Sequence, residues 1–190
     1  FIFDDLVSAV RAVQNGNIEI MNLATLDYLE VQQTPILEPA MVGITLNGSM
    51  NNEYVLLVHG EAGITSLDAL QDKHIRIDSR GRIAALWLDV LLLRQGLPEG
   101  RVFFADFMKV DRVSRAVLPV FFKQADACIV TRYAFDTMVK LNPQLGRVLK
   151  ALAHSPGFLR GIMCFASTYD PVDKATINGS ALELHTEPEG

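Results

Sequence analysis

Short apolar runs alternate along the chain with longer stretches that have a helical repeat. The runs Tyr54–His59, Ala127–Val130 and Ile162–Ala166 are typical of buried strands. The stretch Ile83–Gln95 predicts an apolar helix, which the turn Gly96-Leu97-Pro98 ends. This alternation of strands and helices predicts an α/β fold with largely parallel sheets.

The same patterns predict further elements. Asp4 or Asp5 can cap a first helix, which Asn15-Gly16-Asn17 stops. A polar tail is expected after Tyr169. The other expected strands are Phe1–Phe3, Ile18–Leu23, Ile75–Asp78, Val102–Ala105 and Val148–Ala153, and the other expected helices are Leu26–Val31, Asp111–Lys123 and Tyr133–Leu141.

One segment of the chain is echoed by another. Gly16–Tyr28 and Lys123–Phe135 align without a gap, so that a polar turn, a carboxylate, a short strand and an aromatic coincide. Ligands of open α/β sheets bind where strands end and helices begin, and Thr25 and Thr131 fall at such joints. Any protein built of βα units shows some echo, which is the alternative. The matched carboxylate and aromatic favour two lobes related by pseudo-symmetry.

Composition and charge narrow the function. The chain has 190 residues and carries a net charge of -5. It is 49% hydrophobic and 21% charged, which is the composition of an ordinary folded globular protein. An acidic chain without a basic stripe argues against nucleic acid and against an anionic membrane surface. No apolar run reaches the roughly 18 residues of a membrane span. The absence of an initiator Met and of a secretory signal indicates a processed or trimmed product.

The sequence predicts no metal, no cofactor and no catalytic residue. The four histidines lack metal-ligand spacing, and no Cys/His cluster resembles a zinc site. A P-loop, a dinucleotide-binding fingerprint and a Gly-x-Ser-x-Gly motif are all missing. Cys128 and Cys164 would form either one disulfide of an exported protein or two buried free thiols, and the second interpretation is favoured.

Several segments in order resemble a known family. They are Tyr54-Val-Leu-Leu-Val, Gly63–Ile77, the turn Asp78–Arg82, the strand Gln124–Ala127 and the Pro-containing turn His154–Gly157. In order and spacing they are similar to type 2 periplasmic solute-binding proteins, in particular the phosphate- and phosphonate-binding (PhnD-like, transferrin-related) branch. The resemblance covers nearly the whole chain, although Lys123 or Gln124 stands where the family usually has Gly.

The resemblance implies a two-lobed fold, each lobe a mostly parallel sheet flanked by helices, with crossover strands joining the lobes. Residues 1–57 and 163–190 would form lobe 1, and residues 58–162 would form lobe 2. The family's first strand and helix precede Phe1 and its last helix follows Gly190, so lobe 1 is expected to be incomplete at both ends. The lobes are expected to close on a ligand by hinge motion about strands near Tyr54–His59 and Ile162–Ala166.

The implied function is that of a non-catalytic receptor of an ABC-type transporter, in the periplasm or facing the cell exterior. Its expected ligand is a small oxyanion such as phosphate or phosphonate in the cleft between the lobes, and its expected partner is an ABC permease or a sensor protein. The oligomeric state stays open. One alternative is an enzyme on the same fold, of the menaquinone-pathway or prephenate-processing type, with Asp126 as its acid or base. Another is the effector-sensing domain of a regulator or sensor kinase. A transcription regulator would need a DNA-binding helix-turn-helix ahead of Phe1.

Ser79, Arg80 and Gly81 are the strongest candidates for binding the oxyanion. A glycine-bearing turn at a helix start presents N–H groups, and Arg80 adds charge-assisted hydrogen bonds. A normally capped helix with solvated arginines is the alternative. Asp78 beside this turn would oppose an anion unless it is paired or protonated.

The resemblance also suggests Tyr54, with Glu53 beside it, as the crossover-strand aromatic that faces the ligand. A half-buried strand residue is the alternative for Tyr54. At the second helix start, Thr131 lies beside Arg132, which could clamp a phosphonate or carboxylate or form a surface salt bridge.

Three further candidates follow from the echo. Thr25 and Asn22 are the first lobe's counterparts of the second helix start, and helix capping is the favoured interpretation for Thr25. Asp126 could accept hydrogen bonds from a ligand or cap the local backbone.

Overall fold

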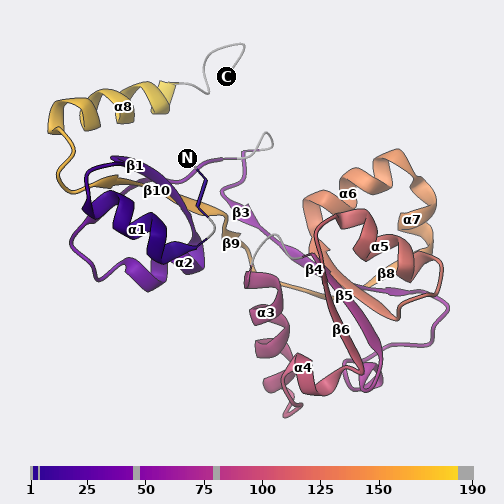
Figure 1. Ribbon diagram of the computed structural model, residues 1–190. Helices are drawn as coiled ribbons and strands as arrows, with labels where there is room; N and C mark the ends of the chain where they lie inside the picture. The colour runs from indigo at the N-terminus through magenta and orange to yellow at the C-terminus, as the bar shows by residue number, and fades with distance from the viewer. Residues whose placement is uncertain (1, 4, 45–47, 79–81, 184–190) are drawn as a thin grey trace. The chain divides into compact units, whose positions relative to one another are not determined.

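The computed structural model describes residues 2–3, 5–44, 48–78 and 82–183, and the chain forms two compact units (Figure 1). Unit 1 comprises Phe1–Met50 with Leu159–Gly190, and unit 2 comprises Asn51–Phe158. The boundaries expected from the sequence, 57/58 and 162/163, fall inside two strands. The structure keeps each of these strands within one unit, because each is hydrogen-bonded along its length to strands of that unit.

Unit 1 is built on a sheet with the strand order β1-β10-β2. Strand β10 is antiparallel to both neighbours, so β1 and β2 share a direction. The two helices that adjoin β1 contribute Val13 and Val31 to a core that also holds Leu23 and Cys164. The elements are α1 (Leu6–Gln14), β1 (Ile20–Ala24), α2 (Thr25–Val31), β2 (Leu37–Met41), β10 (Gly161–Ala166) and α8 (Pro171–Glu183).

The first helix begins and ends as expected. The Asp5 carboxylate accepts hydrogen bonds from the Ser8 N–H at 2.8 Å and from the Ser8 hydroxyl at 2.8 Å. Gly16, at a φ of +70°, takes the left-handed conformation that favours glycine after a helix. Phe1 and Asp4 lie outside the described residues, and Ile2 and Phe3 belong to no strand.

Two elements of unit 1 were not predicted. Strand β2 contains Pro39, which lacks an N–H, and the strand tolerates it because β2 lies at an edge of the sheet. Helix α8 occupies the expected polar tail. The Asp170 carboxylate accepts from the Val172 N–H at 2.7 Å at its start, and Lys174 forms an ion pair with Glu38 of β2 at 2.8 Å.

Unit 2 is built on a sheet with the strand order β6-β5-β7-β4-β8. Strand β5 is parallel to β6 and β7, whereas β4 is antiparallel to β7 and β8. The elements are β4 (Tyr54–His59), η1 (Asp68–Leu70), β5 (His74–Asp78), α3 (Arg82–Leu93), α4 (Gly100–Phe103), β6 (Asp106–Val110), α5 (Val113–Phe121), β7 (Ala127–Thr131), α6 (Arg132–Leu141), α7 (Pro143–Val148) and β8 (Leu149–His154). A separate two-stranded ladder joins β3 (Asn51–Asn52) to β9 (Phe158–Leu159).

Helices cover both faces of the unit 2 sheet (Figure 1). On one face Leu88 of α3 packs in a core with Ile75 and Ile77. On the other face Val117 and Val120 of α5 pack against the sheet. Every residue of β4 is buried, which explains why the strand is apolar from Tyr54 to Val58 and has a polar residue only at its end, His59.

The sheets are mixed rather than mostly parallel. In unit 2 only β4 among the described strands of the sheet is reversed, but in unit 1 both pairs of neighbouring strands are antiparallel. The order of strands and helices along a sequence does not reveal that a late strand, β10, inserts between two early ones. Val102–Ala105, predicted as a strand, is not one: Val102 and Phe103 form the end of helix α4, and Phe104 and Ala105 lie between α4 and β6. The Asp89 carboxylate accepts from the Gly100 N–H at 2.8 Å there, and the strand begins only at Asp106.

The structure confirms the echo in the sequence. The order β1-α2-β2 of unit 1 corresponds to the order β7-α6-α7-β8 of unit 2. In unit 1 the reversed strand β10 lies between β1 and β2, and in unit 2 the reversed strand β4 lies between β7 and β8. The register agrees as well, because Ala24 pairs with Gly161 and its counterpart Thr131 pairs with Tyr54. Gly161 and Tyr54 therefore occupy equivalent positions in the two units.

Both cysteines are free and buried, as the favoured interpretation held. Cys128 lies in β7 of unit 2 and Cys164 in β10 of unit 1, each with no exposed surface. Burial raises the pKa of both thiols. Neither cysteine therefore has the lowered pKa and the access that a reactive cysteine needs.

Candidate functional site

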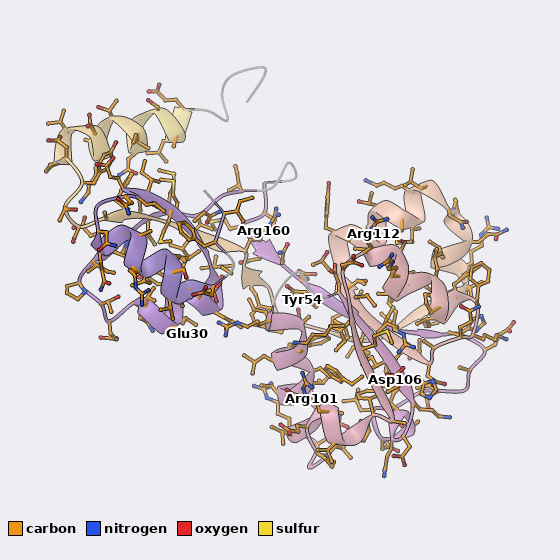
Figure 2. All side chains as sticks on the ribbon, in the orientation of Figure 1. Glu30, Tyr54, Arg101, Asp106, Arg112 and Arg160 are labelled. Atoms are coloured by element: carbon orange, nitrogen blue, oxygen red, sulfur yellow. The ribbon has the colours of Figure 1, made fainter. Side chains whose placement is uncertain are left out.

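In each unit, the strands that run in the same direction all end on the same side of the sheet. We call this side, where the carboxyl ends of these strands lie, the carboxyl edge. In unit 2, β5 ends at Asp78, β7 at Thr131 and β8 at His154, while the reversed strand β4 begins at Tyr54. Figure 2 shows Tyr54 at this edge and Asp106, the first residue of β6, at the opposite end of the sheet. Because α/β sheets bind ligands at the carboxyl ends of their strands, this edge is the candidate site of unit 2.

Tyr54 belongs to the core of unit 2. Its side chain is 7% exposed, and its ring lies 6.3 Å from that of Phe158. The Tyr54 N–H donates to the Ser155 hydroxyl at 2.8 Å, and the Ser155 N–H donates to the Tyr54 carbonyl at 2.9 Å. These contacts fix the start of β4 against the turn that follows β8. They show a packing role for Tyr54, and its contact with a ligand stays a prediction.

Two predicted ligand-binding residues of unit 2 bind each other. The Arg132 Nη1 lies 3.1 Å from the Glu53 Oε2, and the Arg132 N–H donates to the Glu53 carbonyl at 2.8 Å. The Arg132 Nε also lies 3.8 Å from the Asp136 carboxylate. The surface salt bridge, which was one of the two interpretations of Arg132, is thus present. Beside it the Thr131 hydroxyl accepts from the Ala134 N–H at 3.3 Å and caps α6.

The Arg132–Glu53 pair is expected to contribute little to stability. Arg132→Gln and Glu53→Gln should each lower the free energy of unfolding by less than about 1 kcal/mol, because exposed ion pairs contribute only about 0–1 kcal/mol. Urea denaturation of both single variants and of the double variant measures the coupling. A loss above about 3 kcal/mol from either single variant would instead indicate a buried pair. If Arg132 also holds the ligand, Arg132→Gln should weaken anion binding whereas Glu53→Gln should not.

Asp126 lies at the other end of the unit 2 sheet. It directly precedes β7, and its carboxylate accepts from the His74 N–H at 2.9 Å while its own N–H donates to the His74 carbonyl at 3.0 Å. This places Asp126 at the amino end of β7, whereas Thr131 lies at the carboxyl end. The arrangement favours backbone capping over ligand binding for Asp126.

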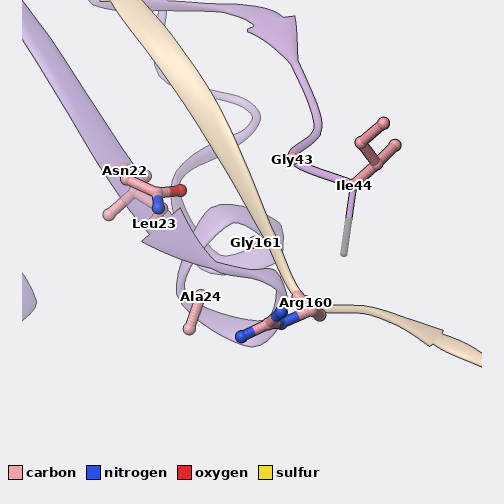
Figure 3. Close-up of a pocket in the computed structure, with 7 residues that line it drawn as sticks. All are labelled: Asn22, Leu23, Ala24, Gly43, Ile44, Arg160 and Gly161. Carbon is pink, nitrogen blue, oxygen red and sulfur yellow. The ribbon is translucent and has the colours of Figure 1, made fainter. Parts of the chain in front are cut away.

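Unit 1 has a pocket of about 320 Å³ where β1 and β2 end and β10 begins (Figure 3). Strand β10 runs between the end of β1 and the segment that follows β2. The lining residues are Asn22, Leu23, Ala24, Gly43, Ile44, Arg160 and Gly161. The pocket therefore lies at the carboxyl edge of unit 1, the counterpart of the Tyr54 edge in unit 2.

The two predicted site residues of unit 1 have different places. Asn22 lines the pocket. Thr25 is the first residue of α2 and not its cap: the cap position is Ala24, which forms no side-chain cap bond, and the Thr25 hydroxyl donates to the Leu159 carbonyl. The capping interpretation of Thr25 is therefore wrong, because the hydroxyl stands one residue beyond the position from which it could cap.

Of the seven described lining residues, sequence reasoning identified only Asn22, and the missed ones with the most informative side chains are Arg160 and Ile44. Arg160 is exposed, and within the part of the chain that the structure describes it forms no ion pair or hydrogen bond. Ile44 is 56% exposed although it is apolar. In the sequence, Arg160 is marked only by its position just before the apolar run of β10. The pairing of Gly161 with Ala24 is what places Arg160 beside the end of β1. Ser79, Arg80 and Gly81 lie outside the described residues.

The described residues hold neither a metal-binding cluster nor a membrane-spanning helix. They contain no group of three or more His, Cys, Asp or Glu side chains placed to hold a metal ion. Among the described helices, none combines the length and the apolar character needed to cross a bilayer.

Known structures share this architecture. A Xanthomonas citri protein solved with ATP has a TM-score of 0.77 at 14% identity, with 100% of this chain and 72% of that chain covered. PhnD1 of Prochlorococcus marinus in complex with methylphosphonate has a TM-score of 0.62 at 12% identity, over 87% and 63% of the two chains. The binding component of a Pseudomonas aeruginosa ABC phosphonate transporter has a TM-score of 0.64 at 13% identity, over 94% and 61%. At such identities the likeness shows the fold, which is that of two-lobed periplasmic binding proteins.

The family follows from the sequence match. No curated protein sequence matched the chain significantly. The model of the phosphonate periplasmic substrate-binding proteins of ABC transporters matches residues 1–190, and the chain belongs to this family. The family consists of periplasmic receptors that bind small molecules and work with ABC permeases, and it is not a class of enzymes.

Proposed function

We propose that this protein is a periplasmic receptor that binds a small oxyanion, such as phosphate or a phosphonate, and delivers it to an ABC permease without chemical conversion. The observation that carries the proposal is the unit 1 pocket, in which the exposed guanidinium of Arg160 stands at the carboxyl edge of the sheet. Family membership supports a small-molecule ligand and a permease partner. Delivery to a sensor protein would use the same binding step.

In unit 2 we propose the corresponding edge as the second part of the binding machinery. The described residues of this edge are Thr131, Arg132 and Tyr54. The end of a parallel strand and the start of α6 meet there, as they do at ligand sites of other α/β sheets. Arg132 could exchange its contact with Glu53 for a contact with an anion, because both side chains are about half exposed.

The lining of the unit 1 pocket supports binding rather than catalysis. The described lining holds one guanidinium and one amide, together with apolar and glycine residues. It lacks the paired acid and base that the enzyme alternative requires. Asp126, the candidate for that role, is engaged with the backbone of His74 at the amino edge of unit 2.

Calorimetric titration of the purified protein with phosphate, methylphosphonate and methanesulfonate tests the proposal. We expect at least one of these oxyanions to bind and to be recovered unchanged. Arginine serves as a cationic amino-acid control and should not bind. If none of the oxyanions binds, or if a bound oxyanion is chemically converted, the proposed function is overturned.

A further inference from the structure

The floor of the unit 1 pocket is a glycine on the central strand. Gly161 pairs with Ala24, and a Cβ at Gly161 would lie 2.9 Å from the Leu23 carbonyl oxygen and 3.1 Å from the Asn22 Oδ1. The equivalent position of unit 2 holds Tyr54, whose ring fills the core there. Unit 1 therefore has no side chain at a position where unit 2 carries an aromatic ring, and Gly161 lines the pocket next to Arg160, the only charged side chain of the described lining.

The charge of the pocket selects the sign of its ligand. Arg160 always carries a positive charge, and the described lining contains no carboxylate to neutralise it. The amide of Asn22 can donate a second hydrogen bond, so a planar or tetrahedral oxyanion would find one charged and one neutral donor. An isolated cation in a partly enclosed pocket gains most from a ligand that brings the opposite charge.

The same lining disfavours a ligand that carries an ammonium group. An ammonium requires a carboxylate or several carbonyl acceptors, and the described lining supplies no carboxylate. An ammonium placed in the pocket would also be repelled by Arg160.

The remaining wall accommodates hydrocarbon. Ile44 exposes 56% of its surface and stands with Gly43 on the β2 side of β10, whereas Asn22 stands on the β1 side (Figure 3). The cavity volume of about 320 Å³ falls in the range of sites for organic small molecules, which is about 300–1,000 Å³. Burying an apolar substituent against Ile44 is favourable in proportion to the area removed from water.

We infer that the unit 1 pocket recognises an amine-free organic oxyanion, with Arg160 and Asn22 holding the anionic head and Ile44 contacting an alkyl substituent. This assignment rests on the proposed function and adds to it the class of ligand and the residue that anchors it. It makes Arg160 the specificity-determining residue of the pocket.

Titration calorimetry of the purified protein with methylphosphonate and 2-aminoethylphosphonate tests the assignment. Methylphosphonate should bind at least about tenfold more tightly than 2-aminoethylphosphonate, because the added ammonium has no carboxylate partner. Arg160→Gln should weaken methylphosphonate binding by about tenfold to hundredfold, the usual effect of removing a charge-assisted hydrogen bond. Arg11→Gln removes the same charge from the exposed face of α1 in unit 1 and should leave the affinity unchanged.

The outcomes separate the assignment from the proposed function. If wild-type protein binds methylphosphonate and Arg160→Gln binds it equally well, the assignment of Arg160 is overturned while the receptor function stands. Equal or tighter binding of 2-aminoethylphosphonate overturns the exclusion of amines. Wild-type protein that binds neither these phosphonates nor phosphate and methanesulfonate overturns both. A circular-dichroism spectrum of Arg160→Gln that matches wild type shows that the variant is folded.

Discussion

Replacing Leu88 by alanine is expected to lower the free energy of unfolding of unit 2 by about 2–5 kcal/mol. Leu88 lies on the inner side of α3, is 0% exposed and packs among the core residues of one face of the sheet. Truncation removes buried methyl groups and leaves a cavity that the strands beneath cannot fill, because they are held in register by their neighbours. Urea denaturation followed by the fluorescence of Trp87, the single tryptophan, reports this loss directly.

The same helix offers a matched control. Leu86 stands two residues earlier and is 49% exposed. Leu86→Ala deletes the same atoms and makes the same change in helix propensity, yet it should alter the free energy of unfolding by no more than about 0.5 kcal/mol. Equal losses in the two variants would contradict the placement of α3 on the sheet.

Gly161→Ala is the second large expected effect, and it concerns unit 1. The added Cβ would stand 2.9 Å from the Leu23 carbonyl oxygen, a backbone atom that cannot move away without disturbing the β1–β10 ladder. We expect a loss of about 1–3 kcal/mol, as is usual for overpacking. We also expect weaker oxyanion binding, because the added methyl group would stand 3.1 Å from the Asn22 Oδ1 and displace this amide, which lines the pocket. Far-UV circular dichroism follows both units whereas Trp87 follows unit 2, so the difference between the two signals assigns the loss to unit 1.

Gly179→Ala is the control for this substitution. Gly179 lies within α8, where an added Cβ would meet nothing within 4 Å. Because alanine is the better helix former, this variant should be more stable than wild type by up to about 1 kcal/mol and should bind oxyanions unchanged. Gly161→Ala with wild-type stability and affinity would show that Gly161 is not needed to form the floor of the pocket.

The candidate site of unit 2 was partly predictable. Thr131 and Arg132 were found because a short apolar strand followed by a helix start is visible in sequence, and the structure places both at the carboxyl edge. The partner of Arg132 was harder to see. Glu53 is far from Arg132 in sequence and becomes its neighbour only because β4 pairs with β7.

Asp126 and Tyr54 illustrate a limit of predicting ligand-binding residues from residue type. Each was singled out for its chemical type, and each has a local structural role, Asp126 with the His74 backbone and Tyr54 with Phe158 and Ser155. A residue type and a position on a strand do not state which end of the sheet, or which face, the side chain will occupy.

The sequence by itself determined the elements that local patterns encode. Apolar runs identified the central strands β4, β7 and β10, whose burial requires them to be apolar throughout or nearly so. The echo between Gly16–Tyr28 and Lys123–Phe135 indicated two related units, and the order of several weak motifs indicated the family.

Only the tertiary structure decided how distant segments meet. The insertion of β10 between β1 and β2 pairs Gly161 with Ala24, and this pairing forms the pocket and brings Arg160 to its rim. No local periodicity records such a pairing, because its hydrogen bonds join backbone groups that are the same in every residue type except proline. The pocket therefore depends on register, which is set by the packing of the whole sheet.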